Sequence, residues 1–212
     1  MLPGPPKEMI PMFEDTVFPY LKKSAGVVLV SKMLKIFGIG ESEMETRIMD
    51  LVDRQDNPTI APYVSMADIT VRVTARCGSK DEAERMLRPV VNEIRSRLGD
   101  LVYSEEGETL EQVVSNLLRE RGLVVSTAES CTGGQLAARL ISLPGASNIF
   151  ERGYVTYSNK AKIEELDVSE QTLAKHGAVS RETAVEMLKG LMKKTKSQVH
   201  IAITGIAGPD GG

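Results

Sequence analysis

Cysteine and histidine, which build many catalytic and metal sites, are scarce in this 212-residue chain. It contains two cysteines, Cys77 and Cys131, and two histidines, His176 and His200. Two cysteines make no disulfide framework, so the reducing cytoplasm is the simplest expected location. The two histidines lie far apart and show no metal-ligand spacing, so we expect no metal site. A Ser-His-Asp triad is also disfavoured, because His200 lies inside a predicted strand.

Long apolar runs and a strong net charge are absent as well. No run approaches the roughly 18–20 apolar residues that a membrane-spanning helix needs, and Met1–Pro6 lacks the charged and apolar regions of a secretory signal. The formal net charge of −3 gives no reason to expect general affinity for nucleic acid. We therefore expect neither membrane nor nucleic acid as a partner. Hydrophobic residues make up 42% of the chain, which is enough for a buried core.

The pattern of apolar residues divides the chain into three parts. Residues 1–33 open with proline and glycine and are too short to form a core alone. Residues 34–102 combine an alternating strand at 69–75 with an amphipathic helix at 80–98, which predicts a small α+β domain. Residues 103–212 alternate predicted strands and helices, which is typical of a layered α/β domain.

Three polar clusters in the α/β part each follow a predicted strand. They are residues 128–134 after strand 123–127, residues 157–162 after strand 154–157, and residues 204–212 after strand 199–203. Binding sites in open α/β sheets gather at the carboxyl ends of the strands. The sequence therefore predicts that the three clusters share one site.

Ser130 is the most informative residue of the first cluster. It lies between a predicted strand and a predicted helix and precedes Gly133 and Gly134, a turn that can hold an anion or present a nucleophile beside oxyanion donors. The alternative is a helix cap, which the local pattern alone favours. Cys131 is a rival nucleophile, although no histidine is predicted beside it to lower its pKa. No Gly-Lys-Ser/Thr sequence occurs here, which disfavours a nucleoside triphosphatase loop.

The other clusters supply candidate partners for Ser130. Lys162 can act as a base only where burial or nearby positive charge lowers its pKa, and the charged pattern around it favours a solvated lysine instead. Tyr157 could have a functional role, relaying a proton or orienting a ligand. The alternative is a half-buried packing residue of a strand, which is more common for a strand tyrosine. Residues 205–208 are suited to holding phosphate through backbone N–H groups, but a simple turn is equally consistent with their spacing.

Four motifs, in this order along the chain, closely resemble the competence/damage-inducible protein CinA family. The resemblance is to its C-terminal nicotinamide-mononucleotide amidohydrolase domain, and the motifs are Thr127–Gly134, Gly153–Lys162, His176–Ser180 and Thr204–Gly212. Upstream, Phe37–Ser42 and Asn57–Tyr63 resemble the KH-like middle domain of the same family. Leu2–Met9 resembles the tail of its N-terminal molybdopterin-binding-like domain.

The resemblance implies hydrolysis of the carboxamide of nicotinamide mononucleotide to nicotinate mononucleotide and ammonia, without a metal or other cofactor. By position, Ser130 would be the nucleophile, Lys162 its base and Tyr157 an assisting hydroxyl. Two loops would supply substrate and oxyanion contacts: Glu129, Thr132, Gly133, Gly134, Thr204, Gly205, Ile206, Ala207 and Gly208. The expected partners are a pyridine nucleotide and further copies of the same chain, in a homo-oligomer.

Two departures from the family pattern limit these expectations. Family members continue past the last motif through a further strand and a Gly-Asp-Arg segment, whose arginine helps hold the substrate phosphate. We therefore expect a truncated α/β domain with weak or no turnover, and a non-catalytic nucleotide-binding or assembly module is the alternative. The KH-like part, residues 34–102, lacks a Gly-x-x-Gly loop, so we do not expect it to bind RNA. The second departure is that the family's N-terminal domain, linked to ADP-ribose hydrolysis, is expected here only as a tail in residues 1–33, so we do not expect that activity.

Overall fold

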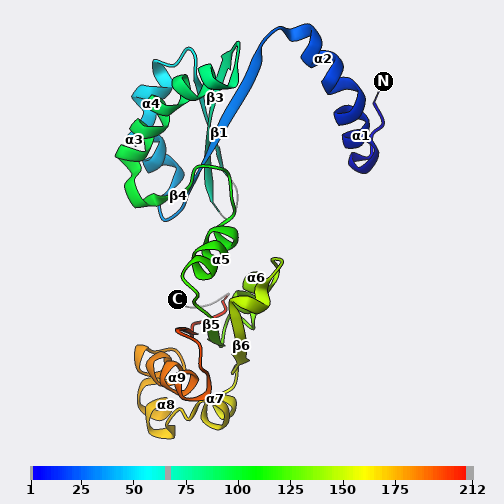
Figure 1. Ribbon diagram of the computed structural model, residues 1–212. Coiled ribbons are helices and arrows are strands. Elements are labelled where there is room, and N and C mark those ends of the chain that lie inside the picture. Colours follow the sequence, from blue (N-terminus) through cyan, green and yellow to red (C-terminus); the bar gives the residue numbers. More distant parts are fainter. Residues whose placement is uncertain (1, 65–67, 209–212) are drawn as a thin grey trace. The chain divides into compact units, whose positions relative to one another are not determined.

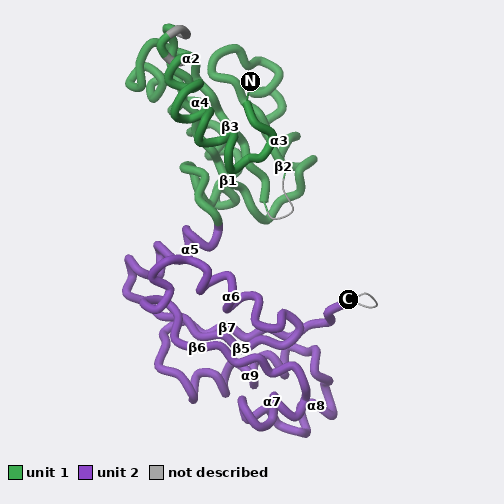
Figure 2. Tube along the Cα trace, turned by 90° about the vertical axis from the view of Figure 1, so that its right-hand side faces the viewer, with its two compact units in different colours: residues 1–109 green, residues 110–212 purple. Residues whose placement is uncertain are grey.

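The computed structural model describes residues 2–64 and 68–208, in two compact units. Residues 1–109 form unit 1 and residues 110–212 form unit 2 (Figure 2). Each unit has its own sheet, four-stranded in unit 1 and three-stranded in unit 2 (Figure 1). The mixed α/β class expected from the sequence is confirmed. Within the described ranges, no helix is long and apolar enough to cross a membrane.

Unit 1 opens with a helical segment. It consists of α1 (Pro6–Met12), a π-helical turn (Phe13–Val17) and α2 (Phe18–Ala25). The first strand, β1, then spans Val28–Ile36. The boundary expected between residues 33 and 34 therefore falls inside β1. The apolar pattern does not mark the start of this strand, because its first half alternates between exposed and half-buried side chains.

The sheet of unit 1 is antiparallel, with strand order β2-β3-β1-β4. The strands after β1 are β2 (Thr59–Val64), β3 (Ile69–Cys77) and β4 (Val102–Ser104). α3 (Glu41–Asp53) and α4 (Lys80–Leu98) cover one face of the sheet and enclose the core with it (Figure 1). The predicted strand and amphipathic helix of this domain are thus confirmed.

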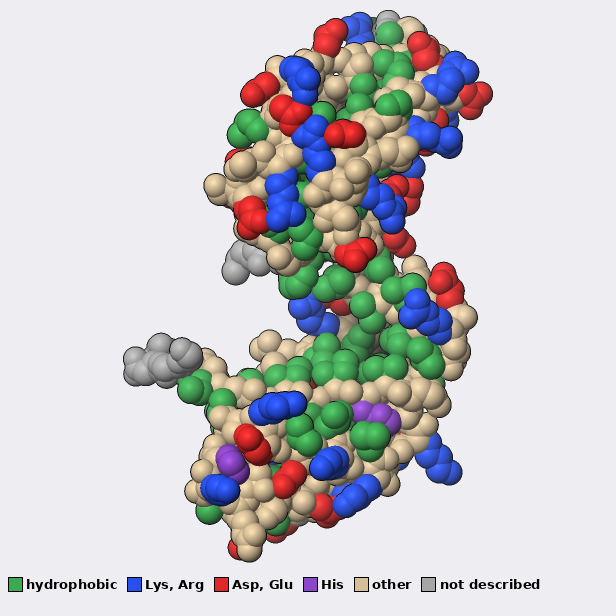
Figure 3. Space-filling model, turned by 90° about the vertical axis from the view of Figure 1, so that its left-hand side faces the viewer, with side chains coloured by type: hydrophobic (Ala, Val, Ile, Leu, Met, Phe, Trp, Pro, Cys, Tyr) green, Lys and Arg blue, Asp and Glu red, His purple; other side chains and the backbone are tan. Residues whose placement is uncertain are grey.

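On the face that Figure 3 shows, acidic and basic side chains of unit 1 are interspersed.

Unit 2 is a layered α/β domain with a parallel sheet in the order β6-β5-β7. Its strands are β5 (Val125–Glu129), β6 (Phe150–Val155) and β7 (Val199–Ile203). Its helices are α5 (Leu110–Glu120), α6 (Gln135–Ile141), α7 (Asn159–Leu166), α8 (Glu170–His176) and α9 (Arg181–Lys194). Figure 2 shows α6 on one side of this sheet and α7, α8 and α9 on the other.

The contact between α7 and α9 has no room for a side chain at Gly190. A Cβ built there would lie 1.9 Å from the carbonyl oxygen of Leu166, the last residue of α7. The backbones of the two helices therefore touch, and α9 fixes the end of α7. α7 also carries Lys162, a candidate catalytic residue.

Candidate active site

The carboxyl ends of the three strands of unit 2 meet at one edge of its sheet. Ser130 follows β5 directly, and its backbone N–H donates to the carbonyl of Ile203, the last residue of β7, at 3.0 Å. Thr156 follows β6, and its N–H donates to the carbonyl of Glu129 at 2.8 Å. The structure thus brings together the three polar clusters that the sequence singled out. Residues 209–212 of the third cluster lie outside the described residues.

Lys162 is the fourth residue of α7, and its side chain contacts Ser130. Its Nζ lies 2.9 Å from Oγ of Ser130, 2.8 Å from the carbonyl oxygen of Thr156 and 3.0 Å from that of Tyr157. Lys162 is fully buried, at 0% exposure, and Ser130 is 6% exposed. The helix that carries Lys162 is capped by Ser158, whose hydroxyl accepts from the N–H of Ala161 at 3.1 Å. The lysine therefore points inward, where the sequence pattern alone favoured a solvated side chain.

Burial controls the charge of this lysine. Loss of hydration lowers the pKa of Lys162 from its ordinary value, and the nearby Cys131 acts in the opposite direction without outweighing it. Within the part of the chain that the structure describes, no carboxylate lies within ion-pair distance of its Nζ. A buried amine without a counter-charge favours its neutral form.

The turn after Ser130 combines tight backbone geometry with spare hydrogen-bond donors. Gly133 donates its N–H to the carbonyl of Ser130 at 3.0 Å, and Gly133 and Gly134 both have left-handed φ angles, 58° and 94°. Side chains at these two positions would be strained. Among the described residues, the backbone N–H groups of Cys131, Thr132 and Gly134 have no acceptor. They are available to a ligand.

Glu129 faces α6. Its Oε2 accepts from the N–H of Leu136 at 3.0 Å, and its Oε1 accepts from the N–H of Ala137 at 2.9 Å and from the hydroxyl of Thr127 at 3.3 Å. The side chain is 1% exposed. Burial alone would raise the pKa of Glu129, but the hydrogen bonds that its carboxylate accepts outweigh this and lower it. The Thr132 hydroxyl lies near the same carboxylate without meeting hydrogen-bond geometry.

Tyr157 does not lie in a strand, as the sequence pattern suggested. β6 begins and ends earlier than expected, so Tyr157 is two residues past its end and its side chain is 67% exposed. The half-buried packing alternative is therefore wrong. Its contact with Lys162 is made by its carbonyl oxygen, and its phenol has no hydrogen bond among the described residues.

The loop after β7, residues 204–208, is the third part of the site. Thr204 donates its hydroxyl to the carbonyl of Ala178 at 2.7 Å, which ties this loop to the segment between α8 and α9. A Cβ at Gly205 would lie 3.0 Å from the sulfur of Cys131, so the loop packs closely on the Ser130 turn. Ile206 is 54% exposed, and Gly208 has a left-handed φ of 78°. The side chain of Cys131 is half-buried here, and it stays a rival nucleophile.

Sequence reasoning missed the groups that hold Lys162 in place. The carbonyls of Thr156 and Tyr157 accept from its Nζ, and a backbone carbonyl leaves no trace in the residue pattern. The sequence also gave no role to Ala178, which anchors Thr204. Within residues 2–64 and 68–208, no group of three or more His, Cys, Asp or Glu side chains is placed to hold a metal ion.

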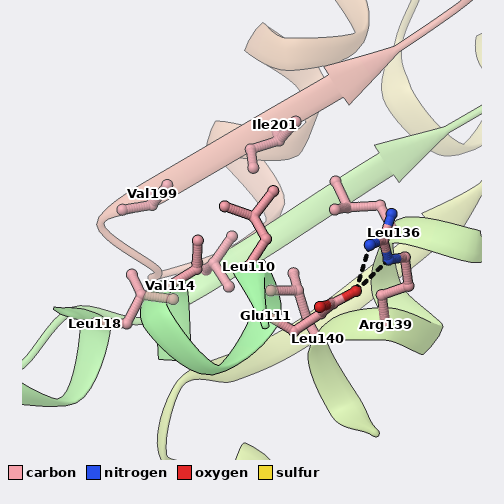
Figure 4. Close-up of a pocket in the computed structure, with 10 residues that line it drawn as sticks. Leu110, Glu111, Val114, Leu118, Leu136, Arg139, Leu140, Val199 and Ile201 are labelled. Atoms are coloured by element: carbon pink, nitrogen blue, oxygen red, sulfur yellow. Dashed lines mark hydrogen bonds and ion pairs between the residues drawn. The ribbon is translucent and has the colours of Figure 1, made fainter. Parts of the chain in front are cut away.

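A separate apolar cavity of about 240 Å³ lies on the α5 and α6 side of the sheet in unit 2 (Figure 4). Its lining includes Leu110, Val114, Leu118, Leu136, Leu140, Val199 and Ile201, with the ion-paired Glu111 and Arg139 at one side. It contains neither Ser130 nor Lys162. The strand-end cluster holds a serine hydroxyl and a buried amine in contact, so it is the better candidate for an active site.

Two protein families match the chain in consecutive stretches. The family described as "Damage-inducible protein CinA KH domain" matches residues 31–104, and the family described as "CinA C-terminal domain" matches residues 107–212. Unit 1 therefore contains the KH match, and unit 2 coincides closely with the C-terminal match.

Curated relatives match the whole of the chain. A "CinA-like protein" of Dictyoglomus turgidum is 51% identical over 212 residues, which are 100% of this chain and 52% of the relative. A "Putative competence-damage inducible protein" of Acetivibrio thermocellus is 52% identical over 212 residues, which are 100% of this chain and 51% of that protein. The chain thus spans about half the length of the curated relatives it matches.

Among solved structures, the "competence/damage inducible protein CihA from Agrobacterium tumefaciens" is 46% identical and has a TM-score of 0.47. The match covers 49% of this chain and 62% of that chain. The C-terminal family match covers half of the 212 residues, and the KH match covers most of the rest. The chain belongs to the CinA family of competence/damage-inducible proteins.

Proposed function

We propose that Ser130 and Lys162 are the nucleophile and base of an amidohydrolase that converts nicotinamide mononucleotide to nicotinate mononucleotide and ammonia. One observation carries the chemistry: a fully buried lysine Nζ lies 2.9 Å from a serine hydroxyl, with no carboxylate beside it among the described residues. A serine becomes nucleophilic when a neighbouring base accepts its proton.

In the structure Nζ of Lys162 donates to the carbonyls of Thr156 and Tyr157 and to Oγ of Ser130. In the proposed reactive form, a neutral amine accepts from Ser130 instead. A neutral amine has two hydrogens and one lone pair, whereas an ammonium has three hydrogens and no lone pair. The carbonyls of Thr156 and Tyr157 can only accept, so they take the two hydrogens. The lone pair then faces Oγ of Ser130, which donates its hydrogen to Nζ. Burial lowers the pKa of Lys162 and so favours this neutral form, which general-base catalysis requires.

The proposed reaction has two halves. Oγ of Ser130 attacks the carboxamide carbon while Nζ of Lys162 takes the hydroxyl proton, and the spare N–H groups of the Ser130 turn, beginning with Cys131, stabilise the oxyanion. Lys162 returns the proton to the leaving nitrogen, and ammonia departs from an acyl-enzyme. Water then attacks the ester, with Lys162 again as base, and releases nicotinate mononucleotide and free Ser130.

The choice of a pyridine nucleotide as substrate rests on the resemblance of the four motifs to the amidohydrolase domain. Within the chain, the loop Thr204–Gly208 is the proposed substrate contact, because glycine-rich loops after strands hold phosphate through backbone N–H groups. Tyr157 is proposed as an assisting hydroxyl, and its exposed phenol is free to turn toward a bound ligand.

Ammonia release from nicotinamide mononucleotide tests the proposal, both in this chain and in a version extended to the length of its relatives. Ser130→Ala should lower kcat by at least about 10³-fold, because the proposed acyl-enzyme forms on Oγ and alanine has no hydroxyl. Ser169→Ala is a matched control, since Ser169 caps α8, which carries none of the reacting groups. Turnover that survives in Ser130→Ala would remove Ser130 from this role.

The alternative is a nucleotide-binding or assembly module without turnover. Titration calorimetry with nicotinamide mononucleotide separates the two proposals. Binding without ammonia release in both the short and the extended chain supports the module.

A further inference from the structure

Glu129 immediately precedes the proposed nucleophile, yet the reaction described above gives it no role. Its carboxylate is 1% exposed, and it accepts hydrogen bonds from the N–H groups of Leu136 and Ala137. It thereby spans the whole turn that contains Ser130, from the end of β5 to the first turn of α6. A carboxylate used in this way is not available to a substrate.

The first backbone N–H groups of α6 need hydrogen-bond acceptors, and the N-cap residue of this helix has no side chain that could provide one. Gly134 is its N-cap residue and has no side chain to accept from the first N–H groups. A negative charge is also favourable at the positive end of a helix dipole. Glu129 meets both needs from a distance of seven and eight residues along the chain, and its lowered pKa keeps the carboxylate ionised.

We propose that Glu129 is a positioning residue for Ser130. Its ionised carboxylate holds α6 against the end of β5, and this fixes the turn that presents Oγ of Ser130 to Nζ of Lys162. The N–H of Cys131, which has no acceptor among the described residues, is the proposed oxyanion donor in this turn. The inference rests on the proposed amidohydrolase function and replaces the substrate contact that the family resemblance implied for Glu129.

Glu129 acts on geometry and not on the charge of the base. Burial and the Cys131 sulfur are the influences on the pKa of Lys162, and Glu129 is not among them. The carboxylate is balanced by the N–H groups of α6 instead. Removing its charge should therefore misplace Ser130 without moving the pH dependence that Lys162 gives to turnover.

Glu129→Gln tests this, because it keeps the shape but places an amide NH₂ against backbone N–H donors. We expect kcat to fall about 100-fold, the loss typical of a reacting group displaced by about 1 Å. KM and the pH at half-maximal kcat should stay unchanged. Thr127→Val, which removes only the 3.3 Å hydrogen bond to the same carboxylate, should give a smaller loss of the same kind and is a milder variant if Glu129→Gln folds poorly.

Glu186→Gln is the matched control. Glu186 accepts from the N–H of Ser169 at 2.8 Å and from the hydroxyl of Thr172 at 2.6 Å, so it also ties the start of a helix, α8, from a distance. Its replacement should lower stability without lowering kcat. A rise in KM with kcat retained in Glu129→Gln would overturn the inference and restore a substrate contact.

Amide hydrogen exchange of residues 130–141, without substrate, separates failure of this inference from failure of the proposed function. Glu129→Gln should exchange faster than wild type in this segment, and Glu186→Gln should not. Unchanged exchange in Glu129→Gln would contradict the positioning role, whatever the reaction is. Faster exchange in a protein whose wild type releases no ammonia would support the link to α6 and refute only the amidohydrolase.

Discussion

In the proposed reaction Lys162 is the base, and among the described residues no carboxylate lies beside it to balance a positive charge. Its side chain is fully buried, and its three oxygen neighbours are two carbonyls and one hydroxyl. Burial lowers its pKa, so the folded state binds the proton more weakly than the unfolded chain does. Such a lysine costs stability while it is protonated in the unfolded chain and neutral in the folded one.

Replacing Lys162 by Met should reveal this cost through its pH dependence. Between the lowered folded-state pKa and the ordinary value of about 10.4, the unfolded chain holds a proton that the folded chain lacks. Raising the pH through this range therefore favours folding of the wild type. Relative to Lys162→Met, its free energy of unfolding should rise from pH 7 to pH 10, by about 1.4 kcal/mol for each unit by which the pKa is lowered.

Urea denaturation of both proteins at the two pH values measures this difference. Lys160→Met is the control, because Lys160 is exposed and forms a surface ion pair with Glu164. Its difference from wild type should not change with pH. A pH-independent difference for Lys162→Met as well would mean that Lys162 is charged in the folded protein, and its role as base would fail.

The elements of unit 2 were largely predictable from the sequence. Alternating strands and helices, and polar clusters at the strand ends, follow from local apolar patterns and turn residues. The burial of Lys162 was not predictable, because α7 reads as a charged helix and the acceptors of Nζ are backbone carbonyls. The exposure of Tyr157 was missed for another reason: β6 pairs with β5 over residues that include Gly153 and charged side chains, which obscure its pattern.

The contact between α7 and α9 makes a prediction at the scale of these elements. Gly190→Ala places a Cβ 1.9 Å from the Leu166 carbonyl oxygen, and backbone cannot give way as a side chain can. The helices must separate, so we expect a loss of about 1–3 kcal/mol in stability and a fall in kcat as Lys162 moves from Ser130. Thermal denaturation and ammonia release measure the two effects.

Gly40→Ala is the control for this variant, because a Cβ at Gly40 meets no atom within 4 Å. It should leave kcat unchanged. Gly190→Ala with wild-type kcat would show that the α7–α9 contact does not set the position of the base.

The two units of the molecule differ in their family matches and in the candidate catalytic residues that they contain. Unit 2 contains the Ser130 and Lys162 pair and matches the C-terminal family, whereas unit 1 matches the KH domain. The absence of a nucleic-acid partner, expected from the net charge, stays a prediction. A homo-oligomer and a cytoplasmic location stay predictions, and neither follows from the arrangement of either unit.

Trapping of the acyl-enzyme is the most direct test of the central claim, that Ser130 is the nucleophile. The extended protein is mixed with nicotinamide mononucleotide, quenched in acid within one turnover and digested for mass spectrometry. We predict a nicotinoyl ribose-phosphate ester on the peptide that contains Ser130, fragmenting to that residue, and none in Ser130→Ala. An adduct on the neighbouring Cys131, or ammonia release with no adduct at any time, would contradict the claim.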